Sequence, residues 1–196
     1  MHEIDFLPVG DGARSGDAIA LRYGNLKGTR AEQTVIVIDG GFSDDGEALV
    51  ELIKTHYDTG RVDVVLGTHL EQDHIGGLAV VLRKLEVGQL WMHQPWVHSS
   101  ALAESRSARF SNLHLSERLQ ESMRNASDLE DIAGDLEIPI VEPFTGLATP
   151  DGCFYVIGPD RAYYEELLGL LPQQETTAAA VLRKLAEAVQ TPLCKS

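Results

Sequence analysis

The chain has 196 residues, of which 43% are hydrophobic and 23% charged, and it is long enough to bury a substantial core within one domain. Its formal net charge of −14 disfavours a stand-alone nucleic-acid-binding protein, which needs clustered lysine and arginine, but it is compatible with a nuclease whose metal ions supply positive charge. Since the sequence has no run of about 20 apolar residues, no signal peptide and no CxxC pair, it predicts a cytoplasmic protein without a membrane partner.

Strand and helix signals alternate along the chain. Runs of β-branched residues or of alternating polarity predict strands at residues 2–9, 17–23, 34–39, 62–66, 89–93, 138–141 and 154–157. The second and third of these strands are expected to form a hairpin through a polar connection. Apolar residues at helical spacing predict helices at residues 44–57, 75–85, 99–125, 128–132, 161–171 and 176–190. This order of elements predicts an α/β fold.

One polar segment concentrates potential metal ligands where the predicted strand 62–66 gives way to a helix. Four of them fall within six residues: His69, Glu71, Asp73 and His74. Imidazole nitrogen and carboxylate oxygen are ligands that divalent zinc, manganese and iron accept. In an extended segment the first two side chains share a side, and the last two follow as the chain bends into the helix. A solvated acidic loop with two incidental histidines is the less favoured alternative.

The same segment carries a family resemblance. His69-x-Glu71-x-Asp73-His74 resembles the HxHxDH signature of the metallo-β-lactamase superfamily, with a carboxylate in place of the second histidine. Three further segments resemble that family's opening VGQGDA hairpin, its IDGG turn and the strand end before its second half: residues 7–19, 37–41 and 156–159. Residues 68–78 are most similar to the THPDxDHIGGL form of competence DNA-uptake (ComEC-type) hydrolase domains and their soluble relatives.

The resemblance implies half of an αββα sandwich, with a mixed β-sheet flanked by helices. Residues 1–160 would be the N-terminal part of the domain, and residues 161–196 a helical extension that leads into the second half or packs on it. The second half of these domains supplies further metal ligands, whereas no histidine follows Asp160 here. We therefore expect a second polypeptide, or a C-terminal half outside this sequence, to complete the fold and to cover an apolar sheet face.

The resemblance also implies a cofactor of two divalent metal ions, manganese or zinc, with magnesium possible. His69 and Glu71 would hold the first ion, and Asp73 with His74 the second. Asp73 would in addition be the catalytic residue that orients the nucleophile and handles its proton. Asp39 is expected either to support a ligand from behind or to act only as a turn residue.

Two later histidines have simpler interpretations. His93 lies between Trp91 and Trp96, and we expect it to pack beside these rings rather than to bind metal. His98 lies at the start of a polar predicted helix and is expected at the surface.

Three functions remain open at this stage. A metal-dependent phosphodiesterase, and in particular a nuclease with a nucleic-acid substrate, is favoured by the ComEC-type resemblance, whose soluble members include proteins of antiviral defence. A small-molecule hydrolase of the lactamase, lactonase or thioesterase type is disfavoured by Glu71, because a histidine would be usual there. A non-catalytic assembly module is disfavoured by the four ligand-type residues retained in one segment.

Overall fold

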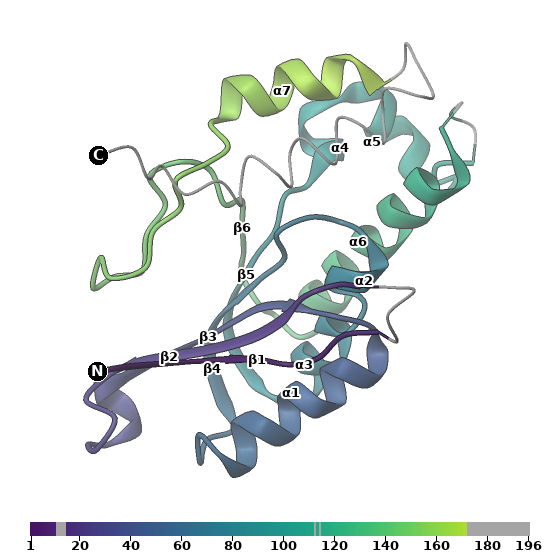
Figure 1. Cartoon of the computed structure of the whole chain (residues 1–196). Helices are drawn as coiled ribbons and strands as arrows, with labels where there is room; N and C mark the ends of the chain where they lie inside the picture. The colour runs from purple at the N-terminus through teal and green to yellow at the C-terminus, as the bar shows by residue number, and fades with distance from the viewer. Residues whose placement is uncertain (11–14, 112, 114, 172–196) are drawn as a thin grey trace. The chain divides into compact units, whose positions relative to one another are not determined.

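The computed structural model describes residues 1–10, 15–111, 113 and 115–171. Within them one mixed sheet has its six strands in chain order (Figure 1): β1 (His2–Phe6), β2 (Ala18–Gly24), β3 (Gln33–Gly40), β4 (Arg61–Leu66), β5 (Glu86–Trp91) and β6 (Ile140–Val141). The first three strands pair antiparallel, and β3 to β6 pair parallel. An α/β fold with a mixed sheet and flanking helices is confirmed. No helix among the described residues has the length and apolarity needed to cross a membrane.

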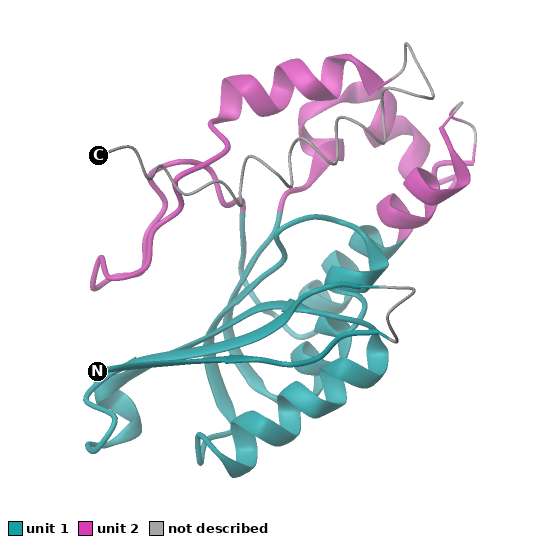
Figure 2. Cartoon of the chain, in the orientation of Figure 1, with its two compact units in different colours: residues 1–92, 125–141 teal, residues 93–124, 142–196 magenta. Residues whose placement is uncertain are grey.

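The chain divides into two compact units (Figure 2). The first comprises residues 1–92 and 125–141 and contains the whole sheet; the second comprises residues 93–124 and the chain from 142 onward. The expected boundary at residue 160 stays a prediction, and the helix expected at 176–190 lies outside the described residues.

The core of the first unit lies between the sheet and two helices, α1 (Ser43–Thr55) and α3 (Leu78–Lys84), which lie side by side (Figure 1). The continuous β-branched run of β3 is buried on both sides, as expected for a central strand. Tyr57, just after α1, donates hydrogen bonds to Asp5 Oδ2 (2.7 Å) and to a carbonyl of β2 (3.1 Å). Ile4 and Phe6 alternate with Asp5 and therefore point to the opposite face, where they are 48% and 73% exposed.

The hairpin between β2 and β3 forms as expected and includes a short 3₁₀ helix, η1 (Arg30–Glu32). The helix expected at 75–85 is confirmed as α3 over residues 78–84, whereas α2 (Gln72–Ile75) is a separate short helix before it. The two helices separate because Gly77 N–H donates to Gly41 O (2.9 Å) and not to its own helix. Helical periodicity cannot reveal this tertiary hydrogen bond, so the helix starts later than the sequence predicts.

The prediction of one long helix at 99–125 is wrong. The described residues form two helices over this region, α5 (Ser100–Arg106) and α6 (Glu117–Asp135), and α6 includes the expected continuation at 128–132. A short helix that was not expected, α4 (Pro95–His98), precedes them. The chain turns after α5 through Arg109 and Phe110, whose φ angles of 49° and 63° lie in the left-handed region. Phe110 is fully buried, so packing of its ring stabilises a turn that polarity alone does not predict.

Two expected strands have other bounds in the structure. β6 covers only the end of the segment 138–141, whereas β5 begins three residues earlier than expected and ends before His93. Residues 154–157 do not join the sheet; they form a local hairpin with a single bridge, Ala148 to Tyr155. The helix expected at 161–171 is confirmed as α7 (Arg161–Gly169), with the Asp160 side chain accepting from Tyr163 N–H (2.9 Å) at its start.

In the second unit His93 stacks on Tyr164, with ring centroids 4.5 Å apart, and lies 4.8 Å from Phe144. Its aromatic contacts are thus with these residues, whereas we expected the tryptophans. His98 is not a surface side chain, because only 3% of it is exposed. Burial, followed by the charges of His98 and Arg161, lowers the pKa of His93 to about 3.

Four glycines allow the backbone of the β3–α1 turn to contact the backbone between α2 and α3. They are Gly40, Gly46, Gly76 and Gly77. A Cβ on Gly77 would lie 2.0 Å from Gly40 O, 2.7 Å from Phe42 O and 2.8 Å from Gly46 N. These are backbone atoms that cannot move independently. A side chain at position 77 would therefore push apart the two loops that follow β3 and β4.

We predict that Gly77→Ala lowers the free energy of unfolding by more than about 2 kcal/mol, through steric overlap with this backbone. Gly134→Ala is the matched control, because a Cβ there meets nothing within 4 Å in the last turn of α6. The control should keep or slightly raise the stability, by up to roughly 0.5 kcal/mol from helix propensity. Urea denaturation measures both; equal stability of the two variants would contradict the close contact.

A second prediction concerns the loss of stability at acidic pH. Since the pKa of His93 is lowered from its usual 6.5 to about 3, its neutral form contributes stability above pH 6.5, and that contribution is lost as the pH falls toward 3. His93→Phe should flatten this part of the stability profile, by at most about 1.4 kcal/mol per pH unit. Denaturation of both proteins in chelator at several pH values measures the difference. Parallel profiles would show that His93 protonates freely in the folded protein.

Candidate metal centre

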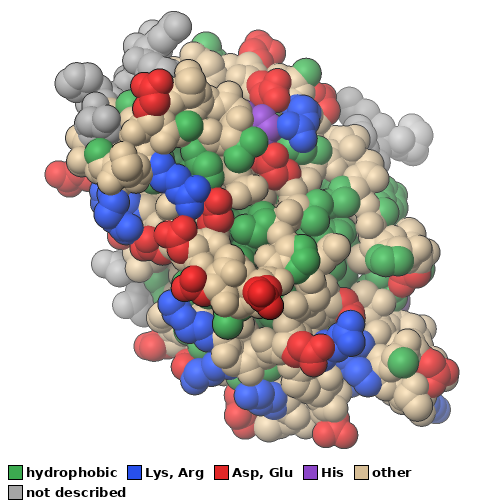
Figure 3. All heavy atoms as spheres, turned by 180° about the vertical axis from the view of Figure 1, so that it is seen from behind, with side chains coloured by type: hydrophobic (Ala, Val, Ile, Leu, Met, Phe, Trp, Pro, Cys, Tyr) green, Lys and Arg blue, Asp and Glu red, His purple; other side chains and the backbone are tan. Residues whose placement is uncertain are grey.

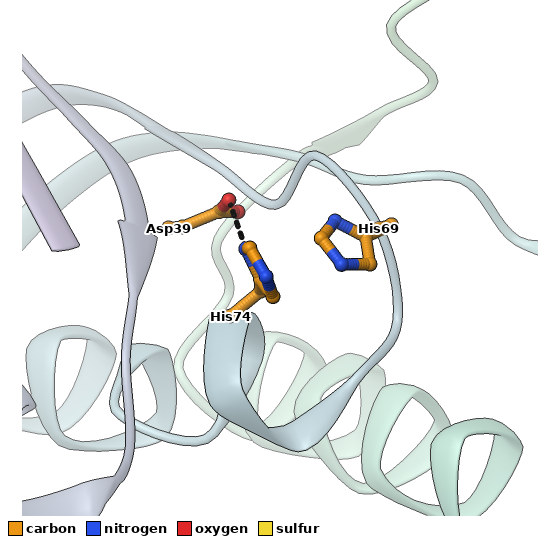
Figure 4. Close-up of side chains that lie close together, drawn as sticks. All are labelled: Asp39, His69 and His74. Carbon is orange, nitrogen blue, oxygen red and sulfur yellow. Dashed lines mark hydrogen bonds and ion pairs between the residues drawn. The ribbon is translucent and has the colours of Figure 1, made fainter. Parts of the chain in front are cut away.

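The candidate metal centre brings together three side chains from three consecutive parts of the first unit (Figure 4). Asp39 comes from the end of β3, His69 from the loop after β4, and His74 from α2. One ligand-type atom of each lies within 4.8 Å of the others. The two imidazole rings are 3.6 Å apart between centroids. Parallel strands place their carboxyl ends at one edge of the sheet, and for this reason the three positions converge.

Asp39 organises this cluster from beneath. It is 1% exposed and has a φ of 55°, a left-handed conformation that aspartate tolerates better than most residues. Its Oδ1 accepts from Thr68 N–H (2.8 Å), and its Oδ2 accepts from Thr68 Oγ1–H (2.6 Å) and His74 Nδ1–H (2.8 Å). A buried carboxylate with three donors fixes both the loop after β4 and the ring of His74.

These hydrogen bonds determine which ring nitrogens are available. The proton of Thr68 Oγ1 points at Asp39, so Thr68 Oγ1 accepts from Nδ1–H of His69 at 3.0 Å. Nδ1 of His74 donates to Asp39. When both rings are neutral, each Nε2 therefore carries a lone pair. Two imidazole Nε2 atoms held by a common carboxylate network fit a divalent metal ion, which needs neutral imidazole ligands.

The two histidines differ in their affinity for protons. Burial, assisted by the charge of His74, lowers the pKa of His69. Burial also opposes protonation of His74, but the hydrogen bond and the charge of Asp39 outweigh it and raise the pKa of that ring. The charges of Asp73 and Asp17 act in the same direction. Metal binding at His74 must therefore displace a proton that these carboxylates stabilise.

The other two predicted ligands flank the cluster. Glu71 Oε2 lies 4.0 Å from His69 Nε2, and Glu71 immediately precedes α2. Asp73 lies in the first turn of α2, and its charge acts on both histidines. The three donors that the structure brings together are thus two of the four predicted ligands and the predicted supporting residue Asp39.

Two further residues belong to this environment, although no role was predicted for them. Thr68 links Asp39 to His69 by hydrogen bonds. Its position directly before the first histidine of the motif is the feature of the sequence that could have identified it. Asp17 Oδ2 lies 3.7 Å from His74 Nδ1, on the side already bonded to Asp39. Its neighbour Gly16 lies against the backbone of Asp73, where a Cβ would be 1.9 Å from the carbonyl oxygen. Gly16 and Asp17, directly before β2, therefore lie beside the centre.

We predict that Asp39→Asn weakens binding of Zn²⁺ or Mn²⁺ by about 10–100-fold, because the amide cannot hold His74 and Thr68 as the carboxylate does. Asparagine also tolerates a positive φ, so the backbone conformation is kept. Asp44→Asn, an exposed carboxylate of the same charge in the first turn of α1, is the control. Titration calorimetry measures both. Unchanged affinity in Asp39→Asn would remove this residue from the centre.

Comparisons with known proteins gave a family match and a structural match. A family profile described as the metallo-beta-lactamase superfamily matches residues 29–162. A search of curated proteins gave no match. Among solved structures, the chain is similar to a candidate metallo-beta-lactamase from Thermotoga maritima, with 15% sequence identity and a TM-score of 0.47. The similarity covers 80% of this chain and 65% of the Thermotoga chain, so this chain spans less than two thirds of that length. Because the family profile covers more than half of the sequence, the chain belongs to the metallo-beta-lactamase superfamily.

Proposed function

We propose that this protein is a metal-dependent phosphodiesterase that cleaves nucleic acid. The observation that carries the proposal is the excess of carboxylates around the two histidines, namely Asp17, Asp39, Glu71 and Asp73. Oxygen-rich sites favour hard cations such as Mn²⁺ and Mg²⁺, which are common partners of phosphate oxygens. The ComEC-type form of residues 68–78 supports the same substrate class.

The proposed site holds two ions. His69 and Glu71 would bind one of them, and His74 and Asp73 the other. Bound divalent ions supply hydroxide near neutral pH and offset negative charge that develops on a phosphate. By accepting from Nδ1–H, Asp39 orients the His74 ring so that Nε2 is the nitrogen that would bind the ion once the ring has lost its second proton. Asp73 orients the attacking water and accepts its proton, a role that suits a partly buried carboxylate beside two histidines.

The net charge favours a role for the metal in binding nucleic acid. The chain carries a formal charge of −14, and on the face shown in Figure 3 lysine and arginine side chains are scattered among acidic ones. Ions bound at the centre would supply local positive charge for a phosphate group in this acidic protein.

We also propose that residues outside this sequence complete the site, supplied by a second polypeptide or by a C-terminal half. Within the described residues of the centre, three donor atoms lie within 4.8 Å of one another, which is fewer than two metal ions require. The exposed Ile4 and Phe6 on the sheet face opposite α1 support a missing covering layer. Intact-mass analysis of the natively purified protein identifies the completing chain.

We predict that the natively purified protein hydrolyses bis(p-nitrophenyl) phosphate and single-stranded DNA in Mn²⁺, and that Asp73→Asn reduces the rate at least ~100-fold. Asp44→Asn should retain full activity, because this carboxylate lies at the exposed start of α1. Parallel assays with a β-lactam, a lactone and a thioester test the alternative substrate class. Hydrolysis of one of these without phosphodiester cleavage would overturn the proposal.

A further inference from the structure

The second unit contains its own group of ligand-type side chains. His93 follows β5, His98 ends α4, Glu142 follows β6 and Glu165 lies in α7. They come from four separate segments of that unit, yet their polar atoms converge. The proposed hydrolytic function does not use any of them.

His98 lies between two carboxylates. Its Nε2 is 2.8 and 3.0 Å from the two oxygens of Glu142, and its Nδ1 is 2.9 Å from Glu165 Oε1. Only 3% of its side chain is exposed. The contact with Glu165 reproduces the arrangement of Asp39 and His74, in which a carboxylate holds one ring nitrogen and directs the other at a shared position.

His93 approaches the same carboxylate without a hydrogen bond. Both of its ring nitrogens are buried and unpartnered, and the residue is 7% exposed. Its Nδ1 lies 4.0 Å from Glu142 Oε1, while the ring is clamped against Tyr164 and Phe144. Burying an imidazole with no hydrogen bond on either nitrogen costs free energy of folding, because neither nitrogen regains the hydrogen bond it made to water. Such a group suggests a ligand that binds there.

A metal ion accounts for these observations better than a proton does. Burial keeps His93 neutral, which leaves a lone pair for coordination. Two imidazoles and one carboxylate are a donor set typical of zinc and its neighbours. The separations of 3.0 and 4.0 Å from Glu142 Oε1 to the two histidines are close to those between ligands that share an ion. The donor atoms of the two histidines and Glu142 do not all lie within 4.8 Å of one another, so metal binding requires the His93 side chain to move toward His98.

We propose that His93, His98 and Glu142 form a second metal site that binds one transition-metal ion, such as Zn²⁺, separately from the candidate metal centre. Glu165 positions His98 from behind. The ion joins α4 to the segment after β6 and, through Glu165, to α7, so its role is to stabilise the second unit.

A metal titration of a chain that lacks the first centre tests this proposal. The variant His69→Ala/His74→Ala should still bind about one Zn²⁺ or Co²⁺ per chain, measured by elemental analysis after dialysis and by Co²⁺ absorption. Adding His93→Phe, which keeps a ring against Tyr164, should abolish this binding and the accompanying rise in Tm. Adding Glu165→Gln should weaken binding about 10–100-fold.

The control concerns another group of potential ligands. Glu3, Asp5 and His56 also have donor atoms within 4.8 Å, but Arg22 and Tyr57 already engage the two carboxylates. His56→Ala in the same background should therefore leave the bound ion in place. If His93→Phe fails to fold, as judged by circular dichroism, Glu142→Gln replaces it. No binding in the His69→Ala/His74→Ala chain, or binding lost only with His56→Ala, would overturn the proposal.

Discussion

The hydrogen bond between the buried carboxylate of Asp39 and Nδ1 of His74 is the interaction on which the centre depends. It joins the end of β3 to α2, and through Thr68 it extends to the loop after β4. A carboxylate that is 1% exposed is tolerable only with such donors around it, so loss of one partner leaves a charge buried without compensation. The glycine contacts between the two loops serve the same convergence, because they let the backbones approach closely enough for side chains 35 residues apart to bond.

The electrostatic consequence is a pair of histidines with different roles. Burial favours the neutral form of His69, whereas the surrounding carboxylates favour a proton, or a cation, on His74. A site with this asymmetry suits a metal ion, since the ion takes the place of the proton and satisfies the acidic residues together. Superfamily membership establishes the chemistry that such a site can host, while the substrate depends on donors and surfaces beyond the two histidines.

The sequence predicted those features that are local. The β-branched run of β3 and the spacing of His69 and His74 each point to their structure within a few residues. Features that depend on distant contacts were not predictable. The helix break at Gly77 needs the carbonyl of Gly41, and the burial of His98 needs carboxylates 44 and 67 residues away. From the sequence, Asp39 was expected to be either a supporting residue or only a turn residue, and its three hydrogen bonds follow only from the fold.

The most direct test of the account is the protonation of the two site histidines, read from long-range ¹H–¹⁵N NMR spectra of the metal-free and Zn²⁺-loaded protein. The account predicts that His69 carries its proton on Nδ1 in both states. When Zn²⁺ binds, we expect His74 also to carry its proton on Nδ1. The ion should then shift the Nε2 resonances of both rings. A proton on Nε2 of either ring in the loaded protein, or Nε2 resonances that Zn²⁺ does not move, would contradict the role assigned to Asp39.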